Sequence, residues 1–277
     1  MGLAGRAVAG LLGLAAARPG AAMRRPDIAY APGPRGRLDL YLPRRPAPGS
    51  PIAVFFYGGS WQSGERGFYR FVGAALAAQG IATAIPDYRV HPEVGWPDFL
   101  HDCAQATAFV RREAAGWGAD PARLFLIGQS AGAYNAAMLA LDRRWLGAAG
   151  LEPADDLAGV IAIAGPYDFL PLRSATLKII FGPGAGPQTQ PMTHAHGGAP
   201  PMLLLVGGKD AAVRPGNTVR LARAIKAEGG KVEHRIYANL GHQGSLTALL
   251  PPLRRRAPVM RDILAFIDRQ SRGRATA

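Results

Sequence analysis

The fold of this chain is set by Leu124–Met138, which reads LFLIGQSAGAYNAAM. The segment opens with four apolar residues, which are typical of a buried strand. Gly-Gln-Ser-Ala-Gly follows at residues 128–132, and a run of small residues suited to a helix comes next. Gly-x-Ser-x-Gly between a strand and a helix predicts a sharp turn that holds the Ser130 hydroxyl outward on a strained corner. We expect a β-carbon at either glycine to crowd the helix against the strand.

Apolar runs and helical patterns alternate along the chain from Pro51 onward. Short apolar runs, expected to be strands, lie at residues 51–57, 81–86, 124–127, 159–164, 202–206 and 232–237. Helical spacing occurs at residues 67–79, 98–115, 131–141, 219–228 and 259–270. This alternation predicts an α/β fold, in which a mostly parallel sheet carries helices on both faces.

The two ends and one internal segment do not follow this alternation. Residues 1–26 are rich in Ala, Gly and Arg, and we expect a low-complexity extension or a weak signal peptide there. We expect one domain over residues 27–270, opened by a hairpin at 27–41, and a polar tail at 271–277. Pro and Gly abound in residues 165–200, which favours a short lid-like insertion. We expect a cytoplasmic protein, with export through the weak N-terminal signal as the alternative.

The composition excludes several classes of protein. The formal net charge is +13, but the arginines are scattered and form no basic stripe with interleaved aromatics, so we expect no nucleic-acid partner. No apolar run reaches the length of a membrane span, so we expect no stable membrane insertion. Cys103 is the single cysteine, which rules out an internal disulfide and indicates a small core residue. The sequence leaves the oligomeric state open.

Residues with useful chemistry follow four of the predicted strands. In a parallel sheet, ligands bind at the carboxyl ends of the strands. Gly58-Gly59, Ser130, Asp210 and His242 each stand just past such an end. We therefore expect them to meet at one edge of the sheet.

Ser130 needs a base, because a serine hydroxyl is a poor nucleophile at its ordinary pKa. We assign this role to His242, which lies in a glycine-bounded loop after the last predicted strand. The other histidines lie in a loop, at a helix start, inside a strand or in the irregular segment; they are His91, His101, His234, His194 and His196. The last two lack the nearby Cys or carboxylate that a metal site needs, and we expect no metal.

The base in turn needs an anion that fixes its tautomer. Asp210 follows an apolar strand and a glycine turn, and we assign it this role. Asp168, which follows the preceding strand, is the alternative. The remaining aspartates between Ser130 and His242 look like helix-end and loop charges; they are Asp142, Asp155 and Asp156.

Attack by a serine on a carbonyl creates an oxyanion, which preorganised N–H donors stabilise. We expect the first donor at Ala131, the residue after the nucleophile. We expect the others at Gly59 and Ser60, with Gly58 as the alternative to one of them by register, because the glycine pair at 58–59 lets the loop turn its N–H groups inward.

With these residues in place, the chain resembles the α/β-hydrolase superfamily. Within it, the chain is most similar to the esterase/lipase group related to hormone-sensitive lipase and to the feruloyl-esterase-like and kynurenine-formamidase-like enzymes. The resemblance covers roughly residues 27–270. It rests on YGGSW at 57–61, PDYR at 86–89, GQSAG at 128–132 and the loops of Asp210 and His242, in the family's order Ser, Asp, His.

Two positions depart from the family pattern. Tyr57 stands where the oxyanion loop usually begins with His, and Ser60 stands where many relatives have a third glycine. A phenol can still donate one hydrogen bond, so we expect the oxyanion hole to persist.

The resemblance implies a serine carboxylic ester hydrolase that works through an acyl-enzyme, needs no cofactor and takes a small-molecule ester as its partner. We expect short-chain acyl or small aromatic esters, since no long cap is present beyond residues 165–200, and we assign Trp61 and Tyr134 to the substrate pocket. One alternative is an amide hydrolase of the arylformamidase type that uses the same residues. The other is a catalytically silent hydrolase fold that binds a ligand, and the presence of His242 argues against it.

Overall fold

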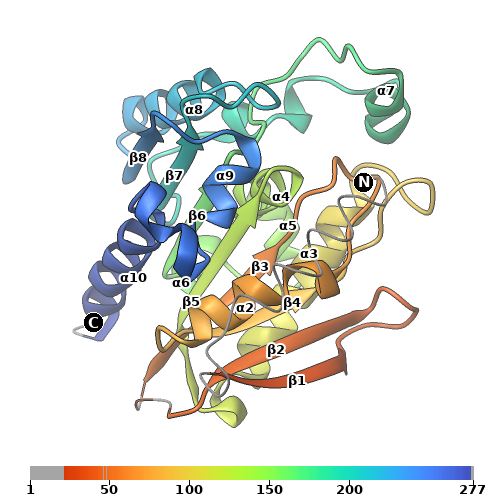
Figure 1. Ribbon diagram of the computed structural model, residues 1–277. Helices are drawn as coiled ribbons and strands as arrows, with labels where there is room; N and C mark the ends of the chain where they lie inside the picture. Colours follow the sequence, from red (N-terminus) through yellow and green to blue (C-terminus); the bar gives the residue numbers. More distant parts are fainter. Residues whose placement is uncertain (1–21, 46, 48, 276–277) are drawn as a thin grey trace.

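The computed structural model describes residues 22–45, 47 and 49–275, and within them eight strands form one sheet (Figure 1). Their order across the sheet is β1-β2-β4-β3-β5-β6-β7-β8. The bounds are Ala22–Ala29 (β1), Arg37–Pro43 (β2), Ser50–Phe56 (β3), Ala82–Pro86 (β4), Ala119–Gln129 (β5), Gly159–Ile163 (β6), Met202–Gly207 (β7) and Val232–Tyr237 (β8). The pairs β1–β2 and β2–β4 are antiparallel and all the others are parallel. The predicted α/β fold with a mostly parallel sheet is confirmed.

Burial along each strand follows its position in the sheet. Every residue of β4, β6 and β7 is buried, as expected for strands that are covered on both faces. Strand β1 lies at one edge of the sheet and is exposed along most of its length. It carries Arg24, Arg25 and Pro26, and charges and proline on an edge strand discourage pairing with another chain.

From β3 onward helices fill the connections between the strands, and α9, η5 and α10 follow β8. The α-helices of the described chain are α2 (Arg70–Ala77), α3 (Asp98–Glu113), α4 (Ala131–Leu141), α5 (Arg143–Gly147), α6 (Pro153–Asp156), α7 (Ala175–Phe181), α8 (Gly216–Ala227), α9 (His242–Thr247) and α10 (Val259–Ala275). Short 3-10 helices are η1 (Arg66–Tyr69), η2 (Ala115–Trp117), η3 (Pro187–Thr189), η4 (Pro191–His194) and η5 (Pro251–Arg256).

The strand register shows that helices α2 and α10 cover the same face. Residues paired across neighbouring strands point to the same side of a sheet. One such row is Tyr41, Thr83, Ala53, Phe125 and Gly159. A β-carbon at Gly73 of α2 would press on the Tyr41 ring at one end of the row, and a β-carbon at Gly159 would lie 2.8 Å from Phe266 of α10 at the other.

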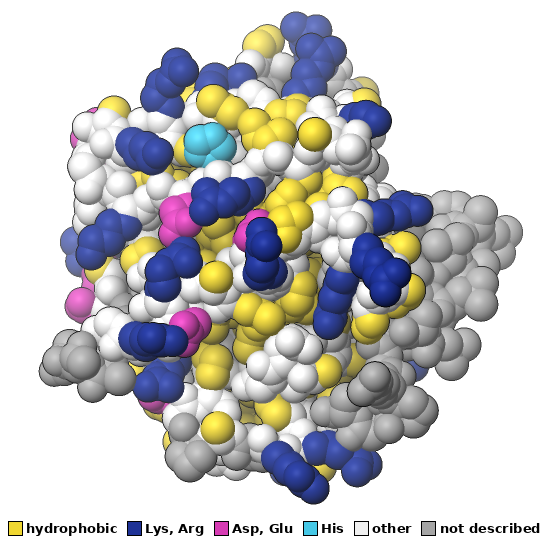
Figure 2. Space-filling model, turned by 60° about the vertical axis from the view of Figure 1, so that its left-hand side comes forward, with side chains coloured by type: hydrophobic (Ala, Val, Ile, Leu, Met, Phe, Trp, Pro, Cys, Tyr) yellow, Lys and Arg dark blue, Asp and Glu magenta, His cyan; other side chains and the backbone are white. Residues whose placement is uncertain are grey.

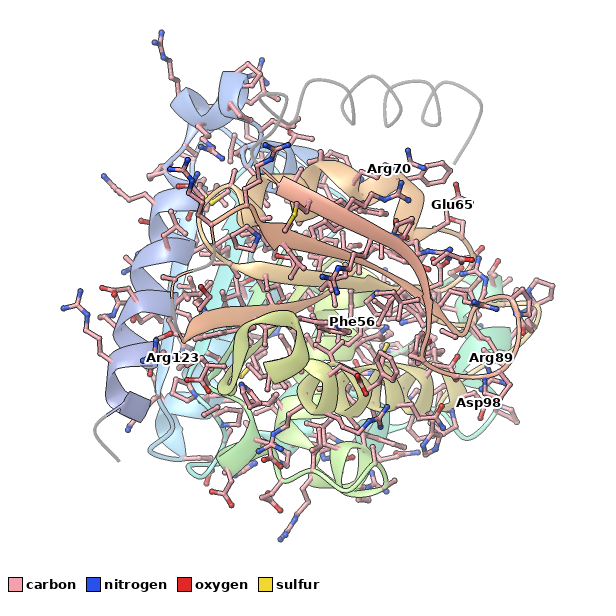
Figure 3. The ribbon with its side chains drawn as sticks, turned by 90° about the horizontal axis from the view of Figure 1, so that it is seen from below. Phe56, Glu65, Arg70, Arg89, Asp98 and Arg123 are labelled. Atoms are coloured by element: carbon pink, nitrogen blue, oxygen red, sulfur yellow. The ribbon has the colours of Figure 1, made fainter. Side chains whose placement is uncertain are left out.

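Helices α3 and α4 cover the opposite face. They pack against each other and against β3 and β5. Figure 3 shows Asp98, at the start of α3, on the other side of the sheet from Arg70, at the start of α2. The sheet is therefore enclosed between two helical layers, as predicted.

The boundaries at the two ends differ from the sequence prediction. Strand β1 begins at Ala22, so residues 22–26 belong to the sheet and not to the extension predicted for residues 1–26. The strand is longer because Ala22 to Arg25 pair in register with the buried strand β2. At the other end, α10 continues to Ala275, where a polar tail was expected from residue 271. The remainder of the predicted extension, residues 1–21, lies outside the described residues.

Residues 165–200 contain no strand in the structure and lie at the carboxyl end of β6. They hold the seven-residue helix α7 and the single turns η3 and η4. Figure 1 shows α7 projecting beyond the body of the molecule. A hollow of about 790 Å³ within this segment is lined by apolar side chains that include Leu170, Leu172 and the exposed Ile179.

The surface agrees with the scattered charges of the sequence. Figure 2 shows Lys and Arg side chains spread over one face of the molecule, without a continuous stripe. Among the described residues, no helix has both the length and the apolar character of a membrane span. Cys103 is fully buried in α3, as predicted for a core residue.

Candidate active site

Ser130 occupies a strained turn between β5 and α4. Its φ of 55° and ψ of −120° lie in a region that residues with a side chain rarely adopt. A β-carbon at Gly128 would overlap the carbonyl of Gly132, so the strand and the helix meet there without room for a side chain. A β-carbon at Gly132 would instead overlap the carbonyl of Phe56, which ends the neighbouring strand β3. The second glycine therefore permits contact with β3 and not with its own strand.

His242 bridges Ser130 and Asp210. Its Nε2 lies 3.0 Å from Ser130 Oγ, and its Nδ1 lies 2.8 Å from Asp210 Oδ2. A carboxylate only accepts hydrogen bonds, so Nδ1 carries the proton and Nε2 presents its lone pair to the serine. The structure thus brings together the three residues chosen from the sequence. His242 begins helix α9, where the sequence suggested a loop.

Asp210 is held in place by its own turn after β7. Its side chain is fully buried. Its Oδ1 accepts hydrogen bonds from the backbone N–H groups of Ala212 (3.0 Å) and Val213 (2.8 Å). Both carboxylate oxygens are therefore occupied, and Oδ2 remains directed at the imidazole.

The alternative carboxylates have other partners. Asp168 accepts a hydrogen bond from Arg220 (2.7 Å), and Asp142 pairs with Arg144 at the start of α5. Asp156 pairs with Arg111. These contacts leave Asp210 as the carboxylate that meets His242.

The loop after β3 passes directly beside Ser130. A β-carbon at Gly58 would lie 2.9 Å from the β-carbon of Ser130. The next three residues, Gly59, Ser60 and Trp61, all have positive φ, at 140°, 54° and 56°. Within the described residues, the N–H groups of Gly59, Ser60 and Ala131 donate to no protein acceptor, so they are free to bind an anion.

Tyr57 orders the start of this loop, as the sequence suggested a phenol could. Its hydroxyl donates to Asp87 Oδ1 at 2.7 Å, and its carbonyl accepts from the Tyr88 hydroxyl at 2.6 Å. Its ring stacks between those of Tyr69 and Tyr88, with centroids 5.2 and 4.8 Å away. Burial, together with the Asp87 carboxylate, raises the pKa of Tyr57 well above its ordinary value, so the hydroxyl keeps the proton that it donates.

Trp61 and Tyr134 lie in the core and do not form open pocket walls. Trp61 is 3% exposed and Tyr134 is completely buried. Trp61 Nε1 donates to Asn135 Oδ1 (3.0 Å), and the Tyr134 hydroxyl donates to the Thr189 carbonyl (2.7 Å). The assignment of both residues to substrate binding is therefore corrected, because their surfaces are occupied by protein.

An aromatic cluster surrounds Trp61. Its members come from the loop, from α3 and α4 and from the 165–200 segment, and they are Trp61, Phe99, Tyr134, Phe169 and Phe181. The lid-like segment is thereby packed onto the far side of the loop through two phenylalanines.

Two further residues near the site were missed in the sequence. Gln129 is buried, and its Nε2 lies 3.4 Å from His242 Nε2. Its position next to the nucleophile could have signalled this contact. Arg35, in the turn between β1 and β2, reaches the loop after β3. No local pattern identifies it, because its partners lie 22 to 53 residues away along the chain.

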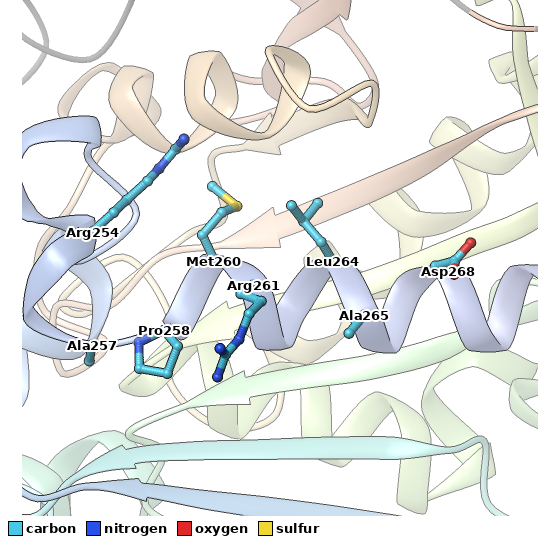
Figure 4. Close-up of a pocket in the computed structure, with 8 residues that line it drawn as sticks. All are labelled: Arg254, Ala257, Pro258, Met260, Arg261, Leu264, Ala265 and Asp268. Atoms are coloured by element: carbon cyan, nitrogen blue, oxygen red, sulfur yellow. The ribbon is translucent and has the colours of Figure 1, made fainter.

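In the part of the chain that the structure describes, no group of three or more His, Cys, Asp or Glu side chains could hold a metal ion. A groove of about 550 Å³ lies elsewhere, along the start of α10 between Arg254, Met260 and Leu264 (Figure 4). None of the residues that line it belongs to the predicted site.

Comparison with known families agrees with this geometry. The family model described as BD-FAE matches residues 38–225. The chain belongs to the BD-FAE family. The match runs from β2 through the Ser130 turn and the Asp210 turn into α8, and it ends before His242.

Curated relatives of this BD-FAE family member include two named esterases. A probable isoprenylcysteine alpha-carbonyl methylesterase ICME from Oryza sativa subsp. japonica is 29% identical over 262 residues, covering 87% of this chain and 63% of the relative. Esterase LipQ from Mycobacterium tuberculosis is 30% identical over 244 residues, covering 80% of this chain and 58% of the relative. The chain thus spans about six tenths of the length of these relatives.

Solved structures share the fold of this BD-FAE family member. Esterase B from Lactobacillus rhamnosis superposes with a TM-score of 0.83 at 18% identity, covering 98% of this chain and 93% of that structure. A Pyrobaculum calidifontis esterase gives a TM-score of 0.78 at 20% identity, covering 96% and 91%. These likenesses show that the chain has the α/β-hydrolase fold.

Proposed function

We propose that this protein is a serine carboxylic ester hydrolase that acts on short-chain acyl or small aromatic esters. The proposal is carried by one observation: His242 lies within hydrogen-bonding distance of both the strained Ser130 hydroxyl and the buried Asp210 carboxylate. This is the arrangement by which a serine becomes a nucleophile at neutral pH. Two named esterases among the relatives agree with it.

The first half of the reaction acylates Ser130. His242 Nε2 takes the hydroxyl proton as Ser130 Oγ attacks the ester carbonyl carbon, and Asp210 stabilises the imidazolium that forms. The carbonyl oxygen becomes an oxyanion, which receives hydrogen bonds from the N–H groups of Ala131, Gly59 and Ser60. When the tetrahedral intermediate collapses, the carbon–oxygen bond to the alcohol breaks, and His242 returns its proton to the leaving alcohol.

The second half releases the acid. A water molecule gives a proton to His242 Nε2 and attacks the acyl carbon, and the same donors stabilise the second oxyanion. Collapse of this intermediate frees the carboxylic acid, and the proton returns from His242 to Ser130 Oγ. The chain itself supplies the nucleophile, the base and the donors.

The proposed preference for small esters rests on the packing beside the loop after β3. Trp61, Phe169 and Phe181 fill this region with aromatic rings whose centroids lie 5.0 to 6.1 Å apart. Because these rings pack against one another in the core, they fill space on this side of the loop that a long acyl chain would otherwise need.

A substrate series tests the proposal. We expect the wild type to hydrolyse p-nitrophenyl acetate and butyrate, to hydrolyse the palmitate ester far more slowly, and to be labelled covalently by a fluorophosphonate. Ser130→Ala should abolish both labelling and turnover while the protein stays folded. Faster turnover of the palmitate ester would overturn the preference for short chains. Turnover of N-formylkynurenine but of no ester would favour the amide hydrolase, and a wild type that is neither active nor labelled would favour a binding protein.

A further inference from the structure

Arg35 connects the β1–β2 turn with the loop after β3, residues 58–64. Its Nη1 donates to the Tyr57 hydroxyl (3.2 Å) and to the Tyr88 carbonyl (2.9 Å), and its Nη2 donates to the Gly64 carbonyl (3.0 Å). Arg35 precedes the residues that match the BD-FAE family model, which begin at 38. Arg89 and the β1–β2 turn line the same small pocket. Figure 3 shows Arg89 and Glu65 at the same end of the molecule.

The acceptors of Arg35 stand at both ends of the loop. Tyr57 immediately precedes residues 58–64, and Gly64 closes them. A β-carbon at Gly64 would lie 2.7 Å from the Tyr57 ring, so the closing residue packs flat against the opening one. One guanidinium therefore bridges the two ends of the loop. The N–H groups of Gly59 and Ser60 lie between these ends, so their positions depend on it.

The Tyr57 hydroxyl is fully engaged only when Arg35 is present. The Tyr57 hydroxyl donates a hydrogen bond to Asp87 and accepts one from Arg35. Asp87 also accepts hydrogen bonds from the backbone N–H of Arg66 (2.7 Å) and from the Arg66 guanidinium. Tyr57, Tyr88 and Asp87 are all buried. Buried acceptors that lose a donor cannot be rescued easily by water, so the loop would shift to find new partners.

We propose that Arg35 is a positioning residue for the oxyanion hole, acting through Tyr57 and Gly64 without touching substrate. This inference rests on the proposed esterase function of the same site. Displacement of N–H donors lowers the stability of the transition state more than that of the bound ester, since the charge appears only in the transition state. Loss of Arg35 should therefore act on kcat and leave KM nearly unchanged.

The test compares Arg35→Met with Arg24→Met. Arg24 lies on the same hairpin and pairs with Asp39 (2.8 Å), so it controls for general weakening of β1 and β2. With p-nitrophenyl acetate, and with active enzyme counted by fluorophosphonate titration, we expect Arg35→Met to lower kcat about 10- to 100-fold with KM within about threefold. Arg24→Met should stay within about threefold of wild type in both constants. Arg35→Lys should recover part of kcat, because an ammonium can reach some of the acceptors.

Two further measurements separate positioning from folding. Binding of a trifluoromethyl ketone, which forms a tetrahedral adduct with the serine, should weaken in Arg35→Met in proportion to kcat/KM. Hydrogen exchange of the amides in residues 58–64 should be faster in Arg35→Met than in Arg24→Met, and this holds whether or not an ester is hydrolysed.

Equal kcat values per active site for Arg35→Met and Arg24→Met would overturn the inference. So would unchanged loop exchange, or a loss explained entirely by fewer titratable sites. A wild type without esterase activity or labelling would instead refute the proposed function, and loop exchange would then still decide whether Arg35 orders this segment.

Discussion

The turn that holds Ser130 and the loop that carries Gly59 and Ser60 lie side by side, but they are built differently. The turn is made by consecutive residues: a buried strand, two glycines and a helix of small side chains. The loop is held by side chains that come from distant segments, among them Arg35, Asp87 and Asn135. The proposed nucleophile is thus encoded locally, whereas the positions of the N–H donors proposed to serve it depend on the whole fold.

The largest expected effect on catalysis comes from removing the charge of Asp210, which binds His242 beside the Ser130 turn. Asp210→Asn keeps the shape of the side chain but removes the anion that sets the His242 tautomer. We expect kcat to fall about 10⁴-fold with little change in KM. The measurement is ester turnover at saturating substrate, with thermal unfolding to confirm that the variant is folded. A loss of less than about tenfold would mean that another group orients the imidazole.

The second-largest effect is expected for a substitution that disturbs the backbone of the Ser130 turn. Gly128→Ala places a β-carbon on the carbonyl of Gly132, and backbone cannot move aside as a side chain can. We expect a loss of about 3 kcal/mol or more in the free energy of unfolding, measured by urea denaturation. Gly116→Ala is the matched control, since its β-carbon would meet no atom within 4 Å, and it should cost less than about 1 kcal/mol. Equal losses in the two variants would contradict this account.

A change in the aromatic cluster that packs against the loop after β3 should have a smaller effect on activity. Trp61→Phe keeps an aromatic ring in the cluster and removes the indole N–H that donates to the buried Asn135. We expect a loss of about 1 to 2 kcal/mol in stability and a smaller loss of kcat than in Arg35→Met. Trp117→Phe, in a partly buried position outside the loop, serves as the control. If Trp61→Phe lowered kcat more than Arg35→Met, the aromatic cluster would be the main support of the donors.

The smallest expected effect is a pH dependence of the stability that arises at Asp39, a buried residue of β2. Burial alone would raise the pKa of Asp39, but hydrogen bonds from Arg24, the Asp27 N–H and Arg66 outweigh burial and lower it. An acid with a lowered pKa contributes stability above its unfolded value of about 3.9, and this contribution is lost as pH falls through the folded value. Stability should therefore decline below about pH 4.

Asp39→Asn tests this assignment, because asparagine does not titrate. Its unfolding free energy should be lower at neutral pH and should vary less between about pH 5 and pH 3 than that of the wild type. An unchanged slope would assign the acid sensitivity to other carboxylates, such as Asp142, whose pKa is also lowered by its arginine partner despite burial.

The difference between the two regions also explains what could be predicted from the sequence. Ser130, Asp210 and His242 each follow a strand within a few residues, so their meeting at one edge follows from the parallel sheet. The same reasoning gave most strands and helices within a few residues. It did not place Trp61 and Tyr134, because an aromatic residue near a site looks the same in sequence whether it faces substrate or core.

Long-range partners account for the remaining differences. Ala22 to Arg25 became a strand because β2 offers them an open edge, and their own composition gave no sign of it. Arg35 looks like an ordinary turn residue until Tyr57, Gly64 and Tyr88 are brought around it. Such contacts depend on the completed fold and leave no periodic signal in the chain.

The close backbone packing between Gly132 and the end of β3 matters for any attempt to change the substrate range. Because a β-carbon at this glycine would overlap the carbonyls of Phe56 and Tyr57, the spacing between the start of α4 and the end of β3 is set by two main chains. Libraries that vary the side chains around the pocket should alter which esters are accepted and leave that spacing intact. Selectivity and the reactive geometry can therefore be varied separately in this scaffold, provided that residue 132 remains a glycine.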